Sequence, residues 1–183
     1  MVTGLLLVAF TFFVFARAAV LRGGGQSAAD AAALAATQEA RDDLYERFLD
    51  AIGEDADEDA DLDDILAGED FGSQVPSACG EAAPRLASSN DASIDDCGIA
   101  RGGTGYTVRI RTTGTVGDTV IPGTEAQHGF AGATAVLEGL CEATTEEPDR
   151  VELECEERDW SFDPADEEDL PEARDLFRVY LED

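Results

Sequence analysis

The sequence contains no lysine, so its twelve basic residues are all arginines, and these face 41 aspartates and glutamates for a net charge of −29. A charge of this sign repels phosphate backbones, which excludes non-specific binding to nucleic acid. It equally disfavours docking on an anionic membrane surface. Arginine without lysine, together with abundant alanine, glycine and aspartate, is typical of GC-rich genomes, and strong acidity is typical of salt-adapted proteins. Genome composition and salt adaptation are therefore preferred over a specific functional role as the explanation of the net charge.

Residues that enzymes and metal sites use are also scarce. There is one histidine, His128, and none of the four cysteines forms a C-x-x-C pair, which argues against a zinc site. Without lysine a phosphate-binding loop cannot be completed, and no G-x-S-x-G elbow is present. The glycines at 23–25 follow an apolar segment instead of a strand, so a dinucleotide loop is out of context. We expect no enzyme, cofactor, bound metal or small-molecule substrate.

An acidic run covers residues 54–64. Its alternating aspartates, from Asp55 onward, resemble a calcium loop, but the sixth and twelfth positions hold Ala60 and Leu66 where an EF-hand needs glycine and glutamate. The run is interpreted as a solvated, self-repelling linker.

A long apolar segment opens the chain. Residues 2–16 contain no charge, Arg17 interrupts, and the apolar run then continues to Leu21 before Arg22. About 20 residues are needed to cross a bilayer as a helix, so the segment suffices if Arg17 reaches the interface. A cleaved signal peptide would have a basic start and an A-x-A-like site without a central arginine. A transmembrane anchor at 1–22 is thus favoured over a signal peptide or a buried helix.

An alanine-rich helix is predicted next, at 23–53, because alanine has the highest helix propensity. Small side chains allow another helix to approach closely. We hypothesise a surface for a partner helix, formed by Ala28, Ala29, Ala32, Ala33 and Ala36. The alternative, equally open, is that the same face packs on this protein's own sheet.

The four cysteines indicate disulfides. An even number of cysteines behind an apolar segment is typical of proteins in an oxidising compartment. Four cysteines allow three connectivities. The sequence-local one, Cys79–Cys97 and Cys141–Cys155, is the predicted one, and each bridge would contribute about 3 kcal/mol.

The rest of the chain alternates short helical and extended segments. Helices are expected at 65–68 and 76–87, the second bent or restarted at Pro84. Strands are expected at 106–111, 129–140, 151–156 and 176–181, and an acidic loop at 142–149. Helices followed by strands favour an α+β fold with helices on one face of a small antiparallel sheet. The predicted organisation is an anchor at 1–22, a juxtamembrane helix at 23–53, an acidic linker at 54–70 and a domain at 71–183.

The anchor and the helix after it resemble a known family. Gly4-Leu5-Leu6-Leu7-Val8-Ala9-Phe10 and Gln26-Ser27-Ala28-Ala29-Asp30-Ala31-Ala32-Ala33-Leu34-Ala35-Ala36 are similar to the N-terminal segment of the TadE/TadG-like proteins of Flp pilus assembly. The similarity to TadG-related proteins of high-GC actinobacteria extends to Cys79 and Cys97 around an alanine-rich helix, to the strand at 106–108, and to residues 155–160. Gly80 and Pro84, which interrupt the cysteine helix, depart from the pattern.

This resemblance implies a non-enzymatic component of a Flp/Tad-type pilus or a related secretion apparatus. It would be a single-pass protein of the cell membrane with its C-terminal domain outside the cytoplasm. Its expected partners are the lipid bilayer and other assembly proteins or pilin-like subunits. The alternative is an anchored or secreted extracytoplasmic binding module for divalent cations or cell-wall polymer.

Overall fold

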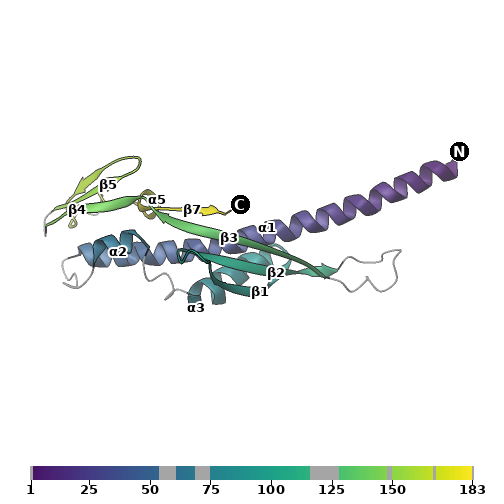
Figure 1. Ribbon diagram of the computed structural model, residues 1–183, viewed down its shortest axis with the longest axis horizontal. Coiled ribbons are helices and arrows are strands. Elements are labelled where there is room, and N and C mark those ends of the chain that lie inside the picture. Colours follow the sequence, from purple (N-terminus) through teal and green to yellow (C-terminus); the bar gives the residue numbers. More distant parts are fainter. Residues whose placement is uncertain are drawn as a thin grey trace.

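A single long helix runs through most of the molecule. The computed structural model describes residues 2–53, 61–68, 75–115, 128–147, 150–166 and 168–182. Helix α1 (Val2–Ile52) extends beyond the remaining elements at its N-terminal end, and its C-terminal half lies along a sheet (Figure 1). The fold is α+β, with this long helix and two small antiparallel sheets.

The three glycines at 23–25 do not interrupt α1. Glycine inside a helix costs up to about 1 kcal/mol relative to alanine, so these three residues lower the intrinsic stability of α1 locally. Gly25 is buried, however, and a Cβ at this position would lie 3.5 Å from Thr112 and 3.7 Å from Ala131. These are ordinary van der Waals distances, so an alanine would also fit, and Gly25 marks the point where the helix first meets the sheet. The predicted juxtamembrane helix is part of the domain's own core.

The larger sheet has the strand order β1-β2-β3-β7, all neighbours antiparallel. Its strands are β1 (Ala92–Ile99), β2 (Gly105–Thr115), β3 (His128–Gly139) and β7 (Phe177–Leu181). Inward-facing Tyr106, Val108 and Ile110 are fully buried, which is the alternation that the sequence predicted for this strand. The small residues of β3 leave room for α1, which packs over this strand.

The smaller sheet has the order β4-β5-β6. It contains β4 (Cys141–Glu147), β5 (Arg150–Cys155) and β6 (Trp160–Phe162). Leu140, between β3 and β4, joins the two sheets: its N–H donates to the carbonyl of Leu176, and its own carbonyl accepts from Glu156. The two sheets are thus tied together by backbone hydrogen bonds.

Short helices complete the fold: α2 (Leu62–Leu66), α3 (Val75–Ser77), the π-helix η2 (Ala78–Ala82), α4 (Ala83–Ser89) and α5 (Ala173–Leu176). The π turn has a local cause. Pro84 has no N–H to donate to the carbonyl of Gly80, and the N–H of Ala83 instead reaches the carbonyl of Ala78, five residues back. The helix predicted at 76–87 is present, and Pro84 begins its second part without ending it.

Two strands differ from the sequence prediction, and a third finding concerns the N-terminal segment. Residues 92–99 form strand β1, whereas no strand was expected before 106. The acidic segment predicted as a loop at 142–149 contributes most of strand β4. A transmembrane helix was expected at 1–22, and over the described ranges no helix is both long enough and apolar enough to cross a membrane.

Candidate functional site

The N-terminal end of α1 carries exposed apolar side chains. Leu6, Val8, Phe10 and Phe12 are 65%, 54%, 56% and 73% exposed, and this part of the helix extends away from both sheets (Figure 1). Contiguous apolar surface of this kind is rare on monomeric soluble proteins and marks a surface that another body covers. This exposed helix end, defined by Leu6, Val8, Phe10 and Phe12, is the first candidate site.

The alanines proposed as a partner surface lie elsewhere. Ala28, Ala29, Ala32, Ala33 and Ala36 are all 0% exposed and belong to the protein's own core. Their small side chains let α1 lie close to β2 and β3, which was the alternative weighed for this face. Because they are buried, they offer no surface to a partner helix in this structure.

Polar contacts fix the rotation of α1 on the sheet. The hydroxyl of Thr37, which is fully buried, donates to the carbonyl of Ala135 at 3.2 Å. The hydroxyl of Tyr45 donates to the carbonyl of Pro171 at 2.9 Å. Burial raises the pKa of the Tyr45 phenol. Rotation of α1 about its own axis would break both hydrogen bonds. The two side chains therefore determine which face of the helix contacts the sheet.

A second tyrosine lies beneath the helix from the sheet side. Tyr106 is fully buried, and burial raises its pKa to about 12, with a further contribution from the charge of Asp43 on α1. Burial also raises the pKa of Asp43, partly opposed by Arg47. The neutral phenol is therefore the stable form throughout the neutral range.

Both disulfides follow the sequence-local pairing, which confirms that prediction. Cys79–Cys97 joins η2 to β1 with Cα atoms 5.7 Å apart. Cys141–Cys155 closes the β4–β5 pair, where the two residues are direct partners in the register, with Cα atoms 4.1 Å apart. One bridge therefore holds the helical layer to the larger sheet, and the other holds the smaller sheet together.

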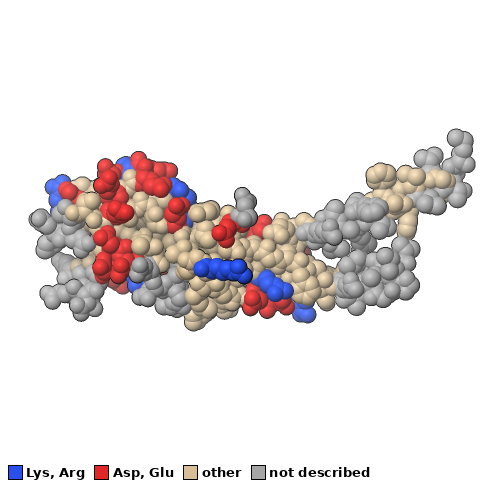
Figure 2. Space-filling model, viewed as in Figure 1, with Lys and Arg blue, Asp and Glu red and all other residues tan. Residues whose placement is uncertain are grey.

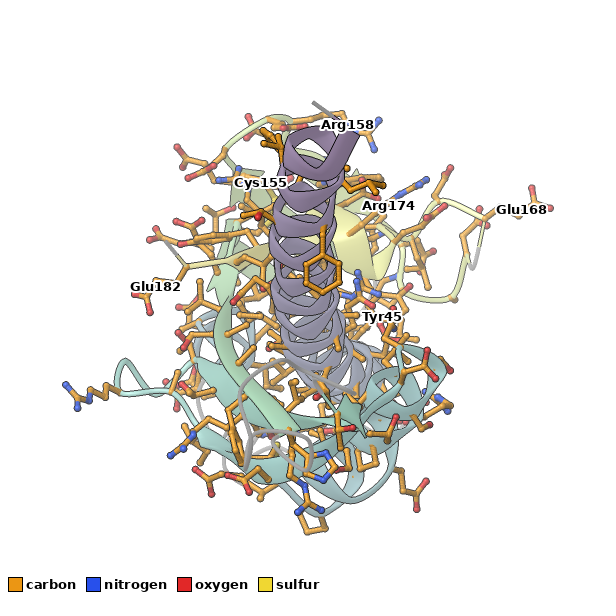
Figure 3. The ribbon with its side chains drawn as sticks, turned by 90° about the vertical axis from the view of Figure 1, so that its right-hand side faces the viewer. Tyr45, Cys155, Arg158, Glu168, Arg174 and Glu182 are labelled. Carbon is orange, nitrogen blue, oxygen red and sulfur yellow. A yellow bond between two sulfur atoms is a disulfide. The ribbon has the colours of Figure 1, made fainter. Side chains whose placement is uncertain are left out.

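A cavity of about 400 Å³ opens where the smaller sheet meets α5 and β7. Its lining includes three arginines (Arg158, Arg174 and Arg178) and Trp160. The guanidinium of Arg158 lies 3.6 Å from the centroid of the Trp160 ring. Figure 3 shows Arg158 and Arg174 in the upper half of the view, with Cys155, which also lines the cavity. This is the second candidate site, called here the inter-sheet cavity.

Ion pairs hold two of the three arginines of the inter-sheet cavity. Arg178 bridges the two sheets, lying 3.3 Å from Glu138 and 2.7 Å from Glu156. The hydrogen bond to Glu156 raises the pKa of Arg178, so this group stays charged. Arg174 pairs with Glu172 at 3.0 Å, and its side chain is 74% exposed.

Sequence reasoning missed this cavity. The signal available was the gathering of Arg158, Arg174 and Arg178 within about twenty residues of Trp160, the sole tryptophan, in a chain with few basic residues.

Three further features were considered in the sequence: the histidine, a possible metal site and the acidic run. The Nδ1 atom of His128, at the start of β3, lies 2.7 Å from the carbonyl of Thr112, a structural contact. Across the described residues, no group of three or more histidine, cysteine, aspartate or glutamate side chains is placed to hold a metal ion. The acidic run proposed as a linker falls outside the described residues at 54–60.

Acidic side chains gather over the end of the molecule that carries β4 and β5, whereas the elements nearer the N-terminal end of α1 show fewer (Figure 2). Glu142 and Glu154 are direct cross-strand partners on this surface, and both are exposed. Like charges placed opposite one another are destabilising, so this face has a cost in stability that dissolved ions reduce.

No protein-family model matches this sequence, and neither the curated proteins nor the solved structures contain a match.

Proposed function

We propose that this protein is a non-enzymatic component of a Flp/Tad-type pilus or a related secretion apparatus, held at the cell membrane by the N-terminal part of α1. The observation that carries the proposal is the exposed helix end, whose apolar side chains need a covering surface. Lipid supplies that surface at the membrane. The resemblance of residues 4–10 and 26–36 to TadE/TadG-like proteins supplies the biological setting.

The two disulfides support placing the domain outside the cytoplasm, because such bonds persist in oxidising compartments. In this orientation Arg17 and Arg22 lie on the outer side of the bilayer, against the usual bias of positive residues toward the cytoplasm. Orientation therefore has to be part of the test.

Membrane attachment is tested by fractionating cells that express the full chain with a C-terminal tag. The protein should pellet with membranes, resist an alkaline carbonate wash and be cleaved when protease is added to spheroplasts. A variant carrying Leu6→Asp, Phe10→Asp and Phe12→Asp should move to the soluble fraction. Asp42→Ser, at an exposed position in the sheet-bound half of α1, is the matched control and should stay with the membrane. A mature product in the medium that begins after Leu21 would refute the anchor.

Assembly is tested separately by co-purification. Detergent extracts of the wild-type cells should yield other components of a pilus or secretion apparatus together with the tagged protein. The triple aspartate variant should lose them. Recovery of the tagged protein alone, from membranes where it is correctly inserted, would contradict the assembly role while leaving the anchor intact.

The second candidate function is an anchored or secreted binding module, which the inter-sheet cavity favours because three arginines and the sole tryptophan converge there. Of the two ligands considered from sequence, the arginines of the cavity disfavour a divalent cation and leave the cell-wall polymer. Calcium binding would appear as a large rise in the thermal midpoint of the full chain when calcium replaces sodium at equal ionic strength.

A further inference from the structure

The inter-sheet cavity has many hydrogen-bond donors. Each arginine side chain carries five N–H groups and no acceptor. Arg178 donates to Glu138 and Glu156, and Arg174 pairs with Glu172. Arg158 makes no ion pair within the part of the chain that the structure describes. Donors from three side chains therefore remain for a ligand rich in oxygen acceptors.

The carboxylates beside the cavity are mostly engaged. The side chain of Asp175 accepts from the backbone N–H of Glu172 at 2.9 Å, as part of the cap of α5. Glu156 is held by Arg178. Glu157 also lines the cavity, where its carboxylate can accept from a ligand hydroxyl. A suitable ligand thus accepts many hydrogen bonds and donates some.

Arg158 and Trp160 line the cavity together. The guanidinium of Arg158, stacked 3.6 Å from the centre of the Trp160 ring, combines a planar cation with an aromatic ring. Leu140 and Cys155 add apolar lining. Such a surface suits the C–H groups of a ring whose edge carries oxygens, because the apolar contact and the hydrogen bonds can form together.

The volume of the cavity and the net charge of the protein restrict the class of ligand further. The volume of about 400 Å³ lies within the range of small-molecule sites, which is about 300–1,000 Å³. The net charge of −29 repels a polyanionic polymer at distances up to a Debye length, about 8 Å in physiological salt. A neutral ligand has no such barrier.

We propose that the inter-sheet cavity binds a neutral saccharide of the N-acetylhexosamine type. Its hydroxyl and acetamido oxygens accept hydrogen bonds from Arg158, Arg174 and Arg178, and its ring packs against the Arg158–Trp160 wall. The binding is reversible and involves no covalent step. The proposal does not depend on the pilus role and would add carbohydrate recognition to it.

The sole tryptophan of the chain, Trp160, lies in this cavity, so its fluorescence reports on binding there. The full-length protein is titrated with chitotriose, a neutral trimer of N-acetylglucosamine, while the Trp160 emission is followed. A saturable change is expected. Arg174→Ala should weaken binding about tenfold or more, since hydrogen bonds from a charged group contribute about 1.5–3 kcal/mol. Arg174 is 74% exposed, so its removal leaves the fold intact.

Arg85→Ala is the matched control. Arg85 is exposed on α4 and is absent from the cavity lining. This variant should bind chitotriose as the wild type does. The absence of any saturable change up to the solubility of the sugar would overturn the proposal. So would equal weakening by both substitutions, or tighter binding of polygalacturonate, a polyanionic sugar polymer, than of chitotriose.

Discussion

At the scale of single residues, Tyr106 connects burial to the dependence of stability on pH. Its folded-state pKa is about 12, raised first by burial and then by Asp43, against an ordinary value of about 10. The unfolded chain therefore loses this proton first as the pH rises. The resulting stability is complete below about pH 10 and is lost between about pH 10 and pH 12, amounting to about 3 kcal/mol.

Urea unfolding from about pH 9 to about pH 12 should thus show a steeper loss of stability in the wild type than in Tyr106→Phe, which has no proton to lose. The difference between the two proteins removes the contribution of all other titrating groups. Parallel curves would mean that Tyr106 ionises normally in the folded state.

Gly139 offers a second prediction at this scale. A Cβ at this position would overlap the backbone carbonyl of Leu66 at the end of α2, and backbone atoms cannot move aside as a side chain can. Gly139→Ala should lower the free energy of unfolding by about 1–3 kcal/mol, measured by urea denaturation. Gly98→Ala is the control, because nothing lies within 4 Å of its added Cβ. Equal effects of the two substitutions would rule out this close approach.

At the scale of elements, the two disulfides close loops of similar length, with sequence separations of 18 and 14 residues. The chain-entropy relation gives each about 3 kcal/mol of stability. Cys79→Ser with Cys97→Ser, and Cys141→Ser with Cys155→Ser, should each lower the free energy of unfolding by this amount.

The two double cysteine variants should differ in the segments whose amides lose protection from hydrogen exchange. Amide hydrogen exchange should speed up most in η2 and β1 for the first pair and in β4 and β5 for the second, since each bridge joins those elements. Exchange that rises evenly over the whole domain in both variants would show that the bridges act only through the unfolded chain.

The strands show how far the sequence could predict the fold. The strand around Tyr106, Val108 and Ile110 was predicted because one face alternates with polar residues and is buried. Strand β1 was missed, because its register shifts between Ile94 and Asp96 and its alternation is broken there. Strand β4 was missed because acidic residues have low strand propensity, and pairing with β5 overrides that preference.

The two candidate sites also differ in how far the sequence predicts them. The exposed apolar residues of α1 follow from local composition, since a run of leucine and phenylalanine is visible in the chain itself. The inter-sheet cavity does not, because Trp160 comes from β6 and Arg174 from α5, and only the packing of one sheet against the other brings them together. Burial of the alanine face likewise depended on a sheet whose position the sequence does not specify.

At the scale of the whole molecule, net charge dominates the electrostatics. Apart from Arg41–Asp42, in which Arg41 is only 24% exposed, the described ion pairs are solvent-exposed, and such pairs contribute at most about 1 kcal/mol each. A net charge of −29 acts on the whole molecule as self-repulsion. Added sodium chloride should therefore raise the thermal midpoint, because screening weakens repulsion more than it weakens these few pairs.

The measurement is a series of thermal scans of the detergent-solubilised full chain from low salt to about 1 M sodium chloride, where the Debye length falls to about 3 Å. A chaotropic salt series at the same ionic strengths separates screening from specific ion effects. A midpoint that falls with sodium chloride would mean that attractive pairs outweigh the net charge.

Helix α1 continues without a break through its three glycines, and this continuity has a mechanical consequence. A helix of 51 residues is about 77 Å long, and the larger sheet clamps only its C-terminal half. The N-terminal half extends beyond the sheets, and a force applied at its end is transmitted along the helix and tilts the folded domain. Gly23 and Gly24, where an added Cβ would meet nothing within 4 Å, precede the part of α1 that lies on the sheet, and glycine makes bending easiest there. Alanines at those two positions would stiffen the helix without disturbing what it is attached to.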